Sequence, residues 1–158
     1  MTRPLLEAKQ LVVEIGGNTV VDRIDLRIAS GERVAILGRN GAGKSTLLST
    51  LAGLRPPKAG VLLLDGEDAA LLHAREAALR RAWLGQFQSD PFGSTVLETA
   101  LTGRHPHLGR WNWESTRDAE LARGALKAVG LDGMETRQIH TLSGGERQRL
   151  SIATLLTQ

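Results

Sequence analysis

The 158-residue chain contains no cysteine and no tyrosine, and aromatic residues make up only 3% of it. Without cysteine there is no disulfide framework, no thiol nucleophile and no cysteine metal site. No stretch reaches the roughly 20 consecutive apolar residues that span a bilayer. The first residues also lack the apolar run of a secretory signal, so we expect a soluble cytoplasmic chain.

The chain also lacks a concentration of charge of one sign. It contains 20 Lys and Arg residues and 17 Asp and Glu residues, and the longest run of basic residues is the pair Arg80-Arg81. A surface that binds nucleic acid usually concentrates basic residues, so no nucleic-acid partner is expected. Hydrophobic residues, at 41%, suffice for a core, which argues against disorder and fits one domain.

Short apolar segments in the first half predict strands. Leu11–Ile15 is rich in β-branched residues and is followed by the turn signal Gly16-Gly17-Asn18. From Ile24 to Ile28 apolar and polar residues alternate, as in a half-buried antiparallel strand. Val34–Leu37 is instead a continuous apolar run, which is typical of a central strand covered on both faces. Val61–Leu64 predicts a further strand.

Apolar residues at helical spacing predict the helices. One helix follows Lys44, with Leu47, Leu48, Leu51 and Leu54 on one stripe. Others are expected over Ala69–Arg81 and Thr95–Gly103, after Ser115 with the buried stripe Leu121, Ala122, Ala125, Leu126 and Val129, and from Ser143 onward.

A glycine-rich loop joins the predicted central strand to the first helix. Gly38-x4-Gly43-Lys44-Ser45 is the P-loop pattern, and a strand before it with a helix after it is the context that this pattern requires. Glycines let the backbone wrap a triphosphate with its N–H groups pointing inward. Lys44 supplies a charge for the β- and γ-phosphates, Ser45 can ligate Mg²⁺ and Thr46 can donate to the α-phosphate. We expect this loop to bind a nucleoside triphosphate through Gly38, Arg39, Asn40, Gly41, Ala42, Gly43, Lys44, Ser45 and Thr46.

A second motif, Leu-Ser-Gly-Gly-Glu-Arg-Gln-Arg, occupies residues 142–149. Ser143 followed three residues later by Glu146 predicts a capped helix start. Gly144 and Gly145 expose backbone N–H groups there, so the motif also predicts a second anion-binding helix start.

The second motif, found downstream of a P-loop, resembles the signature motif of ABC-type ATPases, and the resemblance extends over nearly the whole chain. It implies an α/β fold, the P-loop NTPase cassette of ABC type, which binds ATP and Mg²⁺. Its expected parts are an antiparallel β-subdomain (1–33), a P-loop core with a glutamine loop (34–94), a helical subdomain (95–141), and the signature motif with its helix (142–158).

The resemblance also assigns roles to individual residues. Lys44 and Gln86 are the implied catalytic residues, and Gln86 is preferred to Gln88 because it directly follows the apolar step at Trp83. In the family this glutamine contacts Mg²⁺ and the attacking water, and it couples the nucleotide to the membrane partner. Two subunits pair head to tail, so that ATP on one P-loop is closed by a second subunit's Ser143, Gly144 and Gly145.

Two departures from the family pattern stand out. Ile15 occupies the position where the family usually has an aromatic residue that stacks on adenine. The family pattern also continues, after the signature helix, with a strand ending in Asp-Glu, then a loop Asp and a switch His. These would lie beyond Gln158, so we expect a C-terminally truncated cassette that hydrolyses ATP poorly alone.

The stretch after Gln86 narrows the resemblance. Thr95–Glu98 and Gly103-Arg104-His105-Pro106 resemble ATPases of iron-siderophore, haem and cobalamin importers. Such a subunit would drive import through permease subunits from the cytoplasmic face of the inner membrane. Two other functions remain open, a soluble ABC ATPase without a transport role and a nucleotide-binding fragment without turnover.

Two smaller features also remain open. Trp111 and Trp113 could form a permease docking surface or pack beneath a loop. His105 and His107 could bind a metal or be polar surface.

Overall fold

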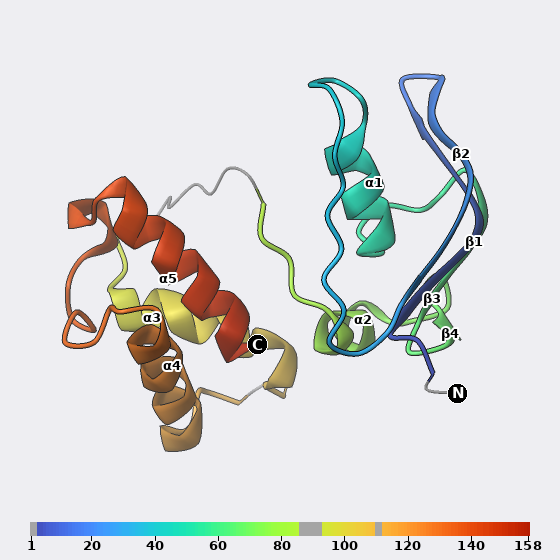
Figure 1. Ribbon diagram of the computed structural model, residues 1–158. Coiled ribbons are helices and arrows are strands. Elements are labelled where there is room, and N and C mark those ends of the chain that lie inside the picture. The colour runs from blue at the N-terminus through green and yellow to red at the C-terminus, as the bar shows by residue number, and fades with distance from the viewer. Residues whose placement is uncertain (1–2, 86–92, 110–111) are drawn as a thin grey trace. The chain divides into compact units, whose positions relative to one another are not determined.

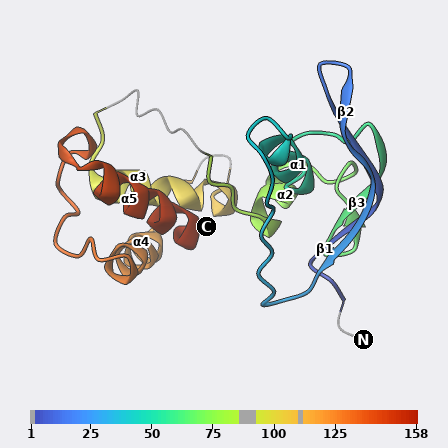
Figure 2. The same ribbon diagram turned by 45° about the horizontal axis from the view of Figure 1, so that its top comes forward.

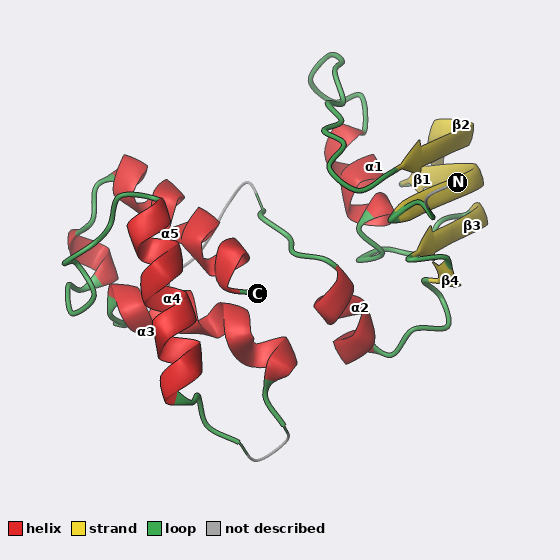
Figure 3. Ribbon diagram, turned by 60° about the horizontal axis from the view of Figure 1, so that its bottom comes forward, coloured by secondary structure: helices red, strands yellow, loops and turns green. Residues whose placement is uncertain are grey.

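The computed structural model describes residues 3–85, 93–109 and 112–158. The chain divides into two compact units, unit 1 (Met1–Arg81) and unit 2 (Ala82–Gln158), each of which is described by itself. Strands occur in unit 1, whereas the regular elements of unit 2 are helical (Figure 3). None of the described helices is long and apolar enough to cross a membrane.

Unit 1 is built on a four-stranded antiparallel sheet of order β2-β1-β3-β4. Its strands are β1 (Leu6–Ile15), β2 (Asn18–Ile28), β3 (Ala59–Leu64) and the short β4 (Glu67–Asp68). Two-residue turns with positive φ at both positions join β1 to β2 and β3 to β4. The first is Gly16-Gly17, where glycine carries this conformation without steric cost. The strands predicted at Leu11–Ile15, Ile24–Ile28 and Val61–Leu64 are therefore confirmed.

One face of this sheet packs against helix α1 (Lys44–Leu51) (Figure 1). Leu47 and Leu51 from α1 join Leu11 and Val13 of β1 and Leu62 of β3 in a buried apolar cluster. The predicted leucine stripe is partly confirmed, since Leu48 and Leu54 of the same stripe are 44% and 48% exposed.

The predicted central strand at Val34–Leu37 is wrong for this structure. No strand forms there, and Val34 and Leu37 are 51% and 90% exposed. A strand depends on hydrogen bonds to a neighbouring strand, and no described residue pairs with this segment. A run of apolar residues is therefore not sufficient to form a strand here.

The helix predicted over Ala69–Arg81 is shorter than expected. Helix α2 spans Ala74–Arg80, and the residues before it form turns. The carboxylate of Glu76 accepts a hydrogen bond from the backbone N–H of His73, which satisfies a donor at the helix start. This local bond favours a start after His73.

Unit 2 is a small helical body. It contains α3 (Val96–Leu101), η1 (Thr102–His107), α4 (Thr116–Ala128), η2 (Ile139–Thr141) and α5 (Gly144–Thr157). Helices α3, α4 and α5 pack together in both views (Figures 1 and 2). Their shared core consists of Val96, Ala100, Ala122, Ala125, Leu126, Leu131, Ile139, Leu142, Leu150 and Ala153.

The helix predicted after Ser115 is confirmed in position, and one residue of its expected stripe is corrected. Ala122, Ala125 and Leu126 are buried, but Leu121 is 45% exposed. Leu121 lies one position before Ala122 and so faces the edge of the packed surface.

Candidate functional site

The start of α1 lacks the side-chain cap that helices usually have. Gly43 is the N-cap residue in a left-handed conformation (φ 83°), no side chain caps the helix, and its first turn contains no acidic residue. Among the residues that the structure describes, no hydrogen-bond acceptor faces the backbone N–H groups of Gly43, Lys44, Ser45 and Thr46. Four donors with a partial positive charge therefore remain available for an anion.

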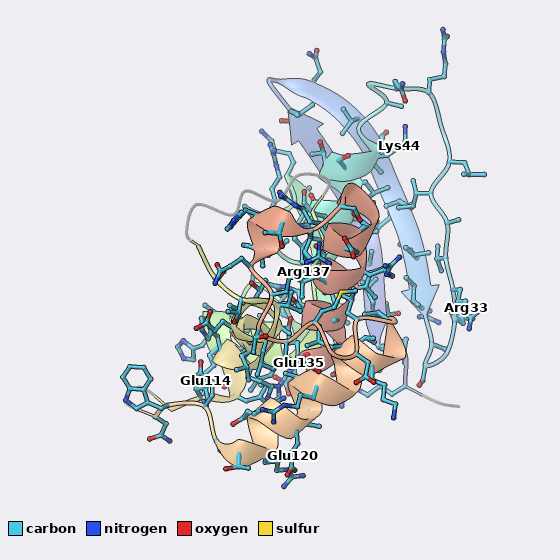
Figure 4. The ribbon with its side chains drawn as sticks, turned by 90° about the vertical axis from the view of Figure 1, so that its left-hand side faces the viewer. Arg33, Lys44, Glu114, Glu120, Glu135 and Arg137 are labelled. Carbon is cyan, nitrogen blue, oxygen red and sulfur yellow. The ribbon has the colours of Figure 1, made fainter. Side chains whose placement is uncertain are left out.

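The Lys44 side chain lies within the loop that precedes α1 (Figure 4). Its Nζ atom donates to the carbonyl oxygens of Gly38 at 2.9 Å and Arg39 at 2.8 Å. Within the described part of the chain, the hydroxyls of Ser45 and Thr46 form no side-chain hydrogen bond. The loop thus combines a cation, free N–H groups and two hydroxyls, which is a donor set suited to a polyphosphate with its divalent cation.

Packing fixes the position of this loop relative to the sheet. A Cβ atom on Gly43 would lie 2.7 Å from the Cβ atom of Val20 on β2. Gly43 is therefore required both by its positive φ and by the close approach of Val20. Sequence patterns do not indicate this contact, because the two residues are far apart along the chain.

Ile15, the expected base contact, is the last residue of β1 and is 45% exposed. It pairs with Asn18 across the hairpin. Residues 1–81 contain no aromatic residue. Any contact between unit 1 and a nucleotide base would therefore be aliphatic.

The second motif forms the start of α5 as predicted. Ser143 is the N-cap, its Oγ accepts from the Glu146 N–H, and the Glu146 carboxylate accepts from the Ser143 N–H at 2.7 Å. Hydrogen bonds to the carboxylate from the side chain of Ser143 and then from its backbone N–H lower the pKa of Glu146, and the charge of nearby Arg137 adds to this effect. Arg137 Nη1 lies 3.2 Å from Glu146 Oε1, and Figure 4 labels Arg137 beside α5.

Gly144 and Gly145 are exposed at this helix start. A Cβ atom on either glycine would meet nothing within 4 Å, and within the described ranges their N–H groups have no acceptor. The two backbone N–H donors therefore remain for an external group. The Glu146 carboxylate beside them makes this a weaker anion site than the start of α1.

Other residues that the sequence singled out do not join this site in the described structure. Gln86, Gln88 and Trp111 lie outside the described residues. Trp113 is 89% exposed, so it does not pack beneath a loop. No group of three or more His, Cys, Asp or Glu side chains in residues 3–85, 93–109 and 112–158 could hold a metal ion.

Residues 21–158 match the ABC transporter family. The chain belongs to the ABC transporter family. This match covers both the P-loop and the signature motif, so the fold is the P-loop NTPase cassette of ABC type.

Curated ABC relatives support the same assignment. The chain is 39% identical over 156 residues to the petrobactin import ATP-binding protein FpuD of Bacillus anthracis, covering 97% of this chain and 56% of that protein. It is 42% identical over 155 residues to the hemin import ATP-binding protein HmuV of Deinococcus radiodurans, covering 98% and 58%. The chain therefore spans little more than half the length of the curated relatives that it matches.

Solved ABC structures share the fold. One, described as a metal-chelate type ABC transporter in an inward-facing conformation, superposes with a TM-score of 0.79 at 27% identity, covering 98% of this chain and 57% of that chain. A nucleotide-free ATP-binding cassette of an ABC transporter gives a TM-score of 0.80 at 24% identity, covering 98% and 65%.

Proposed function

We propose that this chain forms the nucleotide-binding part of the ATP-hydrolysing subunit of an ABC importer. The observation that carries the proposal is the start of α1, where four backbone N–H groups have no acceptor among the described residues and the Lys44 side chain lies within the preceding loop. ATP would place its triphosphate on Gly38–Thr46, with Ser45 as the protein's ligand to Mg²⁺. Ile15 would give the base an apolar contact in place of a ring.

Calorimetric titration of MgATP tests this binding site. Lys44→Ala removes the lysine cation expected to contact the β- and γ-phosphates, and it is expected to weaken binding at least 100-fold. Lys9→Ala is the matched control, because the Lys9 side chain is 52% exposed and pairs with Glu7, eight residues before Ile15 on β1. Equal affinities of the Lys44 variant and the control would refute the P-loop assignment.

In the same titration, Ile15→Tyr is expected to tighten MgATP binding about tenfold, through stacking worth about 1 kcal/mol.

We further propose that turnover takes place in a head-to-tail dimer. The supporting observation is that Gly144 and Gly145 keep free N–H groups at the start of α5. With Ser143 they would close over the γ-phosphate bound by a second subunit, and Gln86 would position the attacking water. In the full-length protein, Ser143→Arg should leave ATP binding by the monomer intact and prevent ATP-dependent dimerisation. Loss of ATP binding by the monomer would contradict this arrangement.

The solute class follows from the relatives. The matched proteins are named for petrobactin, hemin and ferric enterobactin. We therefore propose that the transported solute is an iron chelate or haem, or the cobalamin-like solute that the sequence resemblance also implies. It would be taken up through permease subunits, with this subunit at the cytoplasmic face of the inner membrane. Co-purification with a permease, followed by ATP-driven uptake of ferric siderophore into vesicles, tests this assignment.

Two alternatives give different outcomes in the same assays. A soluble ABC ATPase would hydrolyse ATP without a permease and show no stimulation by one. A nucleotide-binding fragment would bind MgATP and release no phosphate.

The subdomain boundaries proposed above, at residues 33, 94 and 141, can be tested by limited proteolysis with and without MgATP.

A further inference from the structure

The end of α5 that lies farthest from the signature motif makes an unusually close contact with η1. A Cβ atom on Gly103 would lie 2.2 Å from the carbonyl oxygen of Thr154 and 3.2 Å from the Cβ atom of Thr157. Any other residue at position 103 would force the two elements apart. The backbone of η1 is thus held directly against the last turn of α5.

Arg104, the next residue, joins three elements of unit 2. Its Nε atom donates to Asp118 Oδ1 at 2.7 Å, and its Nη1 atom donates to the carbonyl oxygen of Thr157 at 3.0 Å. The side chains of Arg104 and Asp118 are only 14% and 12% exposed. The guanidinium group therefore connects η1, the first turn of α4 and the last turn of α5.

Asp118 is held in place by a second set of hydrogen bonds. Its Oδ2 atom accepts from the Ser115 N–H at 2.9 Å and from the Ser115 Oγ–H at 2.6 Å. Hydrogen bonds from Ser115 and then from Arg104 keep the pKa of Asp118 well below its usual range. The carboxylate is thus a fixed negative partner, and Arg104 cannot shift without losing it.

These contacts lie on one side of α5. The backbone of Gly103 approaches the carbonyl oxygen of Thr154, and the Arg104 side chain donates to that of Thr157. Residues 103 and 104 therefore hold the 154–157 turn of α5 in place.

The signature motif lies at the opposite end of the same rigid element. Helix α5 has 14 residues and is about 21 Å long. Near its start it is held by the Arg137–Glu146 ion pair and by a hydrogen bond from Arg147 to the carbonyl oxygen of Leu142. Two sets of contacts, one at residues 142–147 and one at residues 154–157, therefore define the direction of the helix.

We propose that Arg104 is a positioning residue for the signature motif: by joining Asp118 to the end of α5, it fixes the direction in which α5 presents Ser143, Gly144 and Gly145. This inference rests on the proposed role of these three residues in closing the site of a second subunit. Without Arg104 the helix would remain folded but would tilt about its remaining contacts at residues 142–147, and the motif would be displaced.

The test uses the full-length subunit and four single variants. Arg104→Met keeps most of the side-chain volume but removes the donors, and Asp118→Asn removes the charged partner. Arg104→Lys keeps the charge, but its single ammonium group cannot reproduce the two-armed geometry of the guanidinium. Arg123→Met is the matched control, since Arg123 is exposed on α4 and has no side-chain partner among the described residues.

Two binding measurements separate positioning from general destabilisation. For Arg104→Met we expect MgATP affinity of the monomer within twofold of the parent protein, and ATP-dependent dimerisation weakened at least tenfold by sedimentation. The ATP-dependent dimerisation of Arg104→Lys should be weaker than that of the parent protein and stronger than that of Arg104→Met. Dimerisation of a folded Arg104→Met variant within twofold of the parent would overturn the proposal. A parent protein that binds no MgATP or does not dimerise would refute the proposed function instead.

A third measurement observes α5 directly and needs no nucleotide. Spin labels are attached to cysteines introduced by Lys127→Cys on α4 and Gln148→Cys on α5, two exposed positions. We expect the distance distribution between the labels to broaden or shift in Asp118→Asn and Arg104→Lys, and to stay unchanged in Arg123→Met. An unchanged distribution in both folded test variants would overturn the proposal even if Arg104→Met failed to fold.

Discussion

The start of α1 in unit 1 and the helix starts of unit 2 use the same physical effect for opposite purposes. In unit 2, α3, α4 and α5 each begin with a Ser or Thr cap and an acidic residue three positions later, which together satisfy the N–H groups of the cap and of the third helical residue. In unit 1, α1 begins at Gly43 with no side-chain cap and no acidic residue in its first turn. A capped start stabilises its own helix, whereas an uncapped start leaves its donors to a ligand.

The signature helix stands between these two cases. It has the complete Ser143–Glu146 capping box, yet Gly144 and Gly145 keep N–H groups without an acceptor in the described residues. Its own carboxylate already neutralises part of the positive end of the helix. This explains why the signature would serve to close a site whose phosphates another subunit holds, and why it would not bind a nucleotide by itself.

The largest expected effect comes from making the same substitution at both helix starts. Gly43→Ala forces a left-handed conformation on alanine and places its Cβ atom 2.7 Å from Val20. We expect a loss of at least 100-fold in MgATP affinity and a lower melting temperature. Gly145→Ala meets no neighbouring atom within 4 Å and should raise helix stability by up to about 1 kcal/mol.

Calorimetry and thermal unfolding of the two variants check this contrast. Similar melting temperatures for both variants would show that the Gly43–Val20 approach does not constrain the loop. A Gly43→Ala variant that still bound MgATP normally would remove the argument that the loop conformation defines the site.

A second change gives α1 the acidic residue that the other helices have. Thr46 occupies the position three residues after the Gly43 cap, which is where Glu98, Asp118 and Glu146 lie in unit 2. In Thr46→Glu the new carboxylate would interact favourably with the helix start, by about 0.5 kcal/mol, and would repel a triphosphate. We expect higher thermal stability together with MgATP affinity reduced about 100-fold.

Thr46→Gln is the matched control, since glutamine has the same shape without the charge. Its MgATP affinity should fall about tenfold or less, through loss of the hydroxyl donor alone. If the Glu and Gln variants bound MgATP equally, charge at the start of α1 would not be what selects the ligand.

Sequence patterns predicted the features whose causes are local. The Gly16-Gly17 hairpin and the capping boxes at Ser115 and Ser143 depend on residues within a few positions of each other, and all are present. The P-loop could be recognised for the same reason, because its glycines, lysine and serine follow one another directly.

The features that sequence patterns missed depend on distant partners. Val34–Leu37 has the composition of a strand, but strand formation requires a neighbour that the described chain does not place beside it. The Arg104–Asp118 pair joins residues 14 positions apart, and the Val20–Gly43 approach links β2 to the loop before α1. Periodicity carries no information about such pairings.

The smallest expected effect is the pH dependence of the capped helices. Hydrogen bonds from the backbone and hydroxyl of Thr95 lower the pKa of Glu98, and those from Ser143 lower the pKa of Glu146. A carboxyl whose pKa is lower in the folded state contributes stability above its ordinary pKa, near 4, and loses it as the pH falls through the folded value. The stability should therefore decrease as the pH falls below about 4.

Thermal unfolding at pH 5 and pH 2.5 separates this contribution from general acid effects. Glu98→Gln preserves the capping geometry without a titrating group, so its melting temperature should drop about 2 °C less than that of the parent. Glu120→Gln is the control, because Glu120 is exposed on α4 and forms no ion pair among the described residues, and it should follow the parent. Identical pH dependence of the two variants would mean that the capping carboxylates stabilise unit 2 no more than surface charges do. The difference between capped and uncapped helix starts would then have no electrostatic consequence. The preference of the α1 start for an anion would have to come from Lys44.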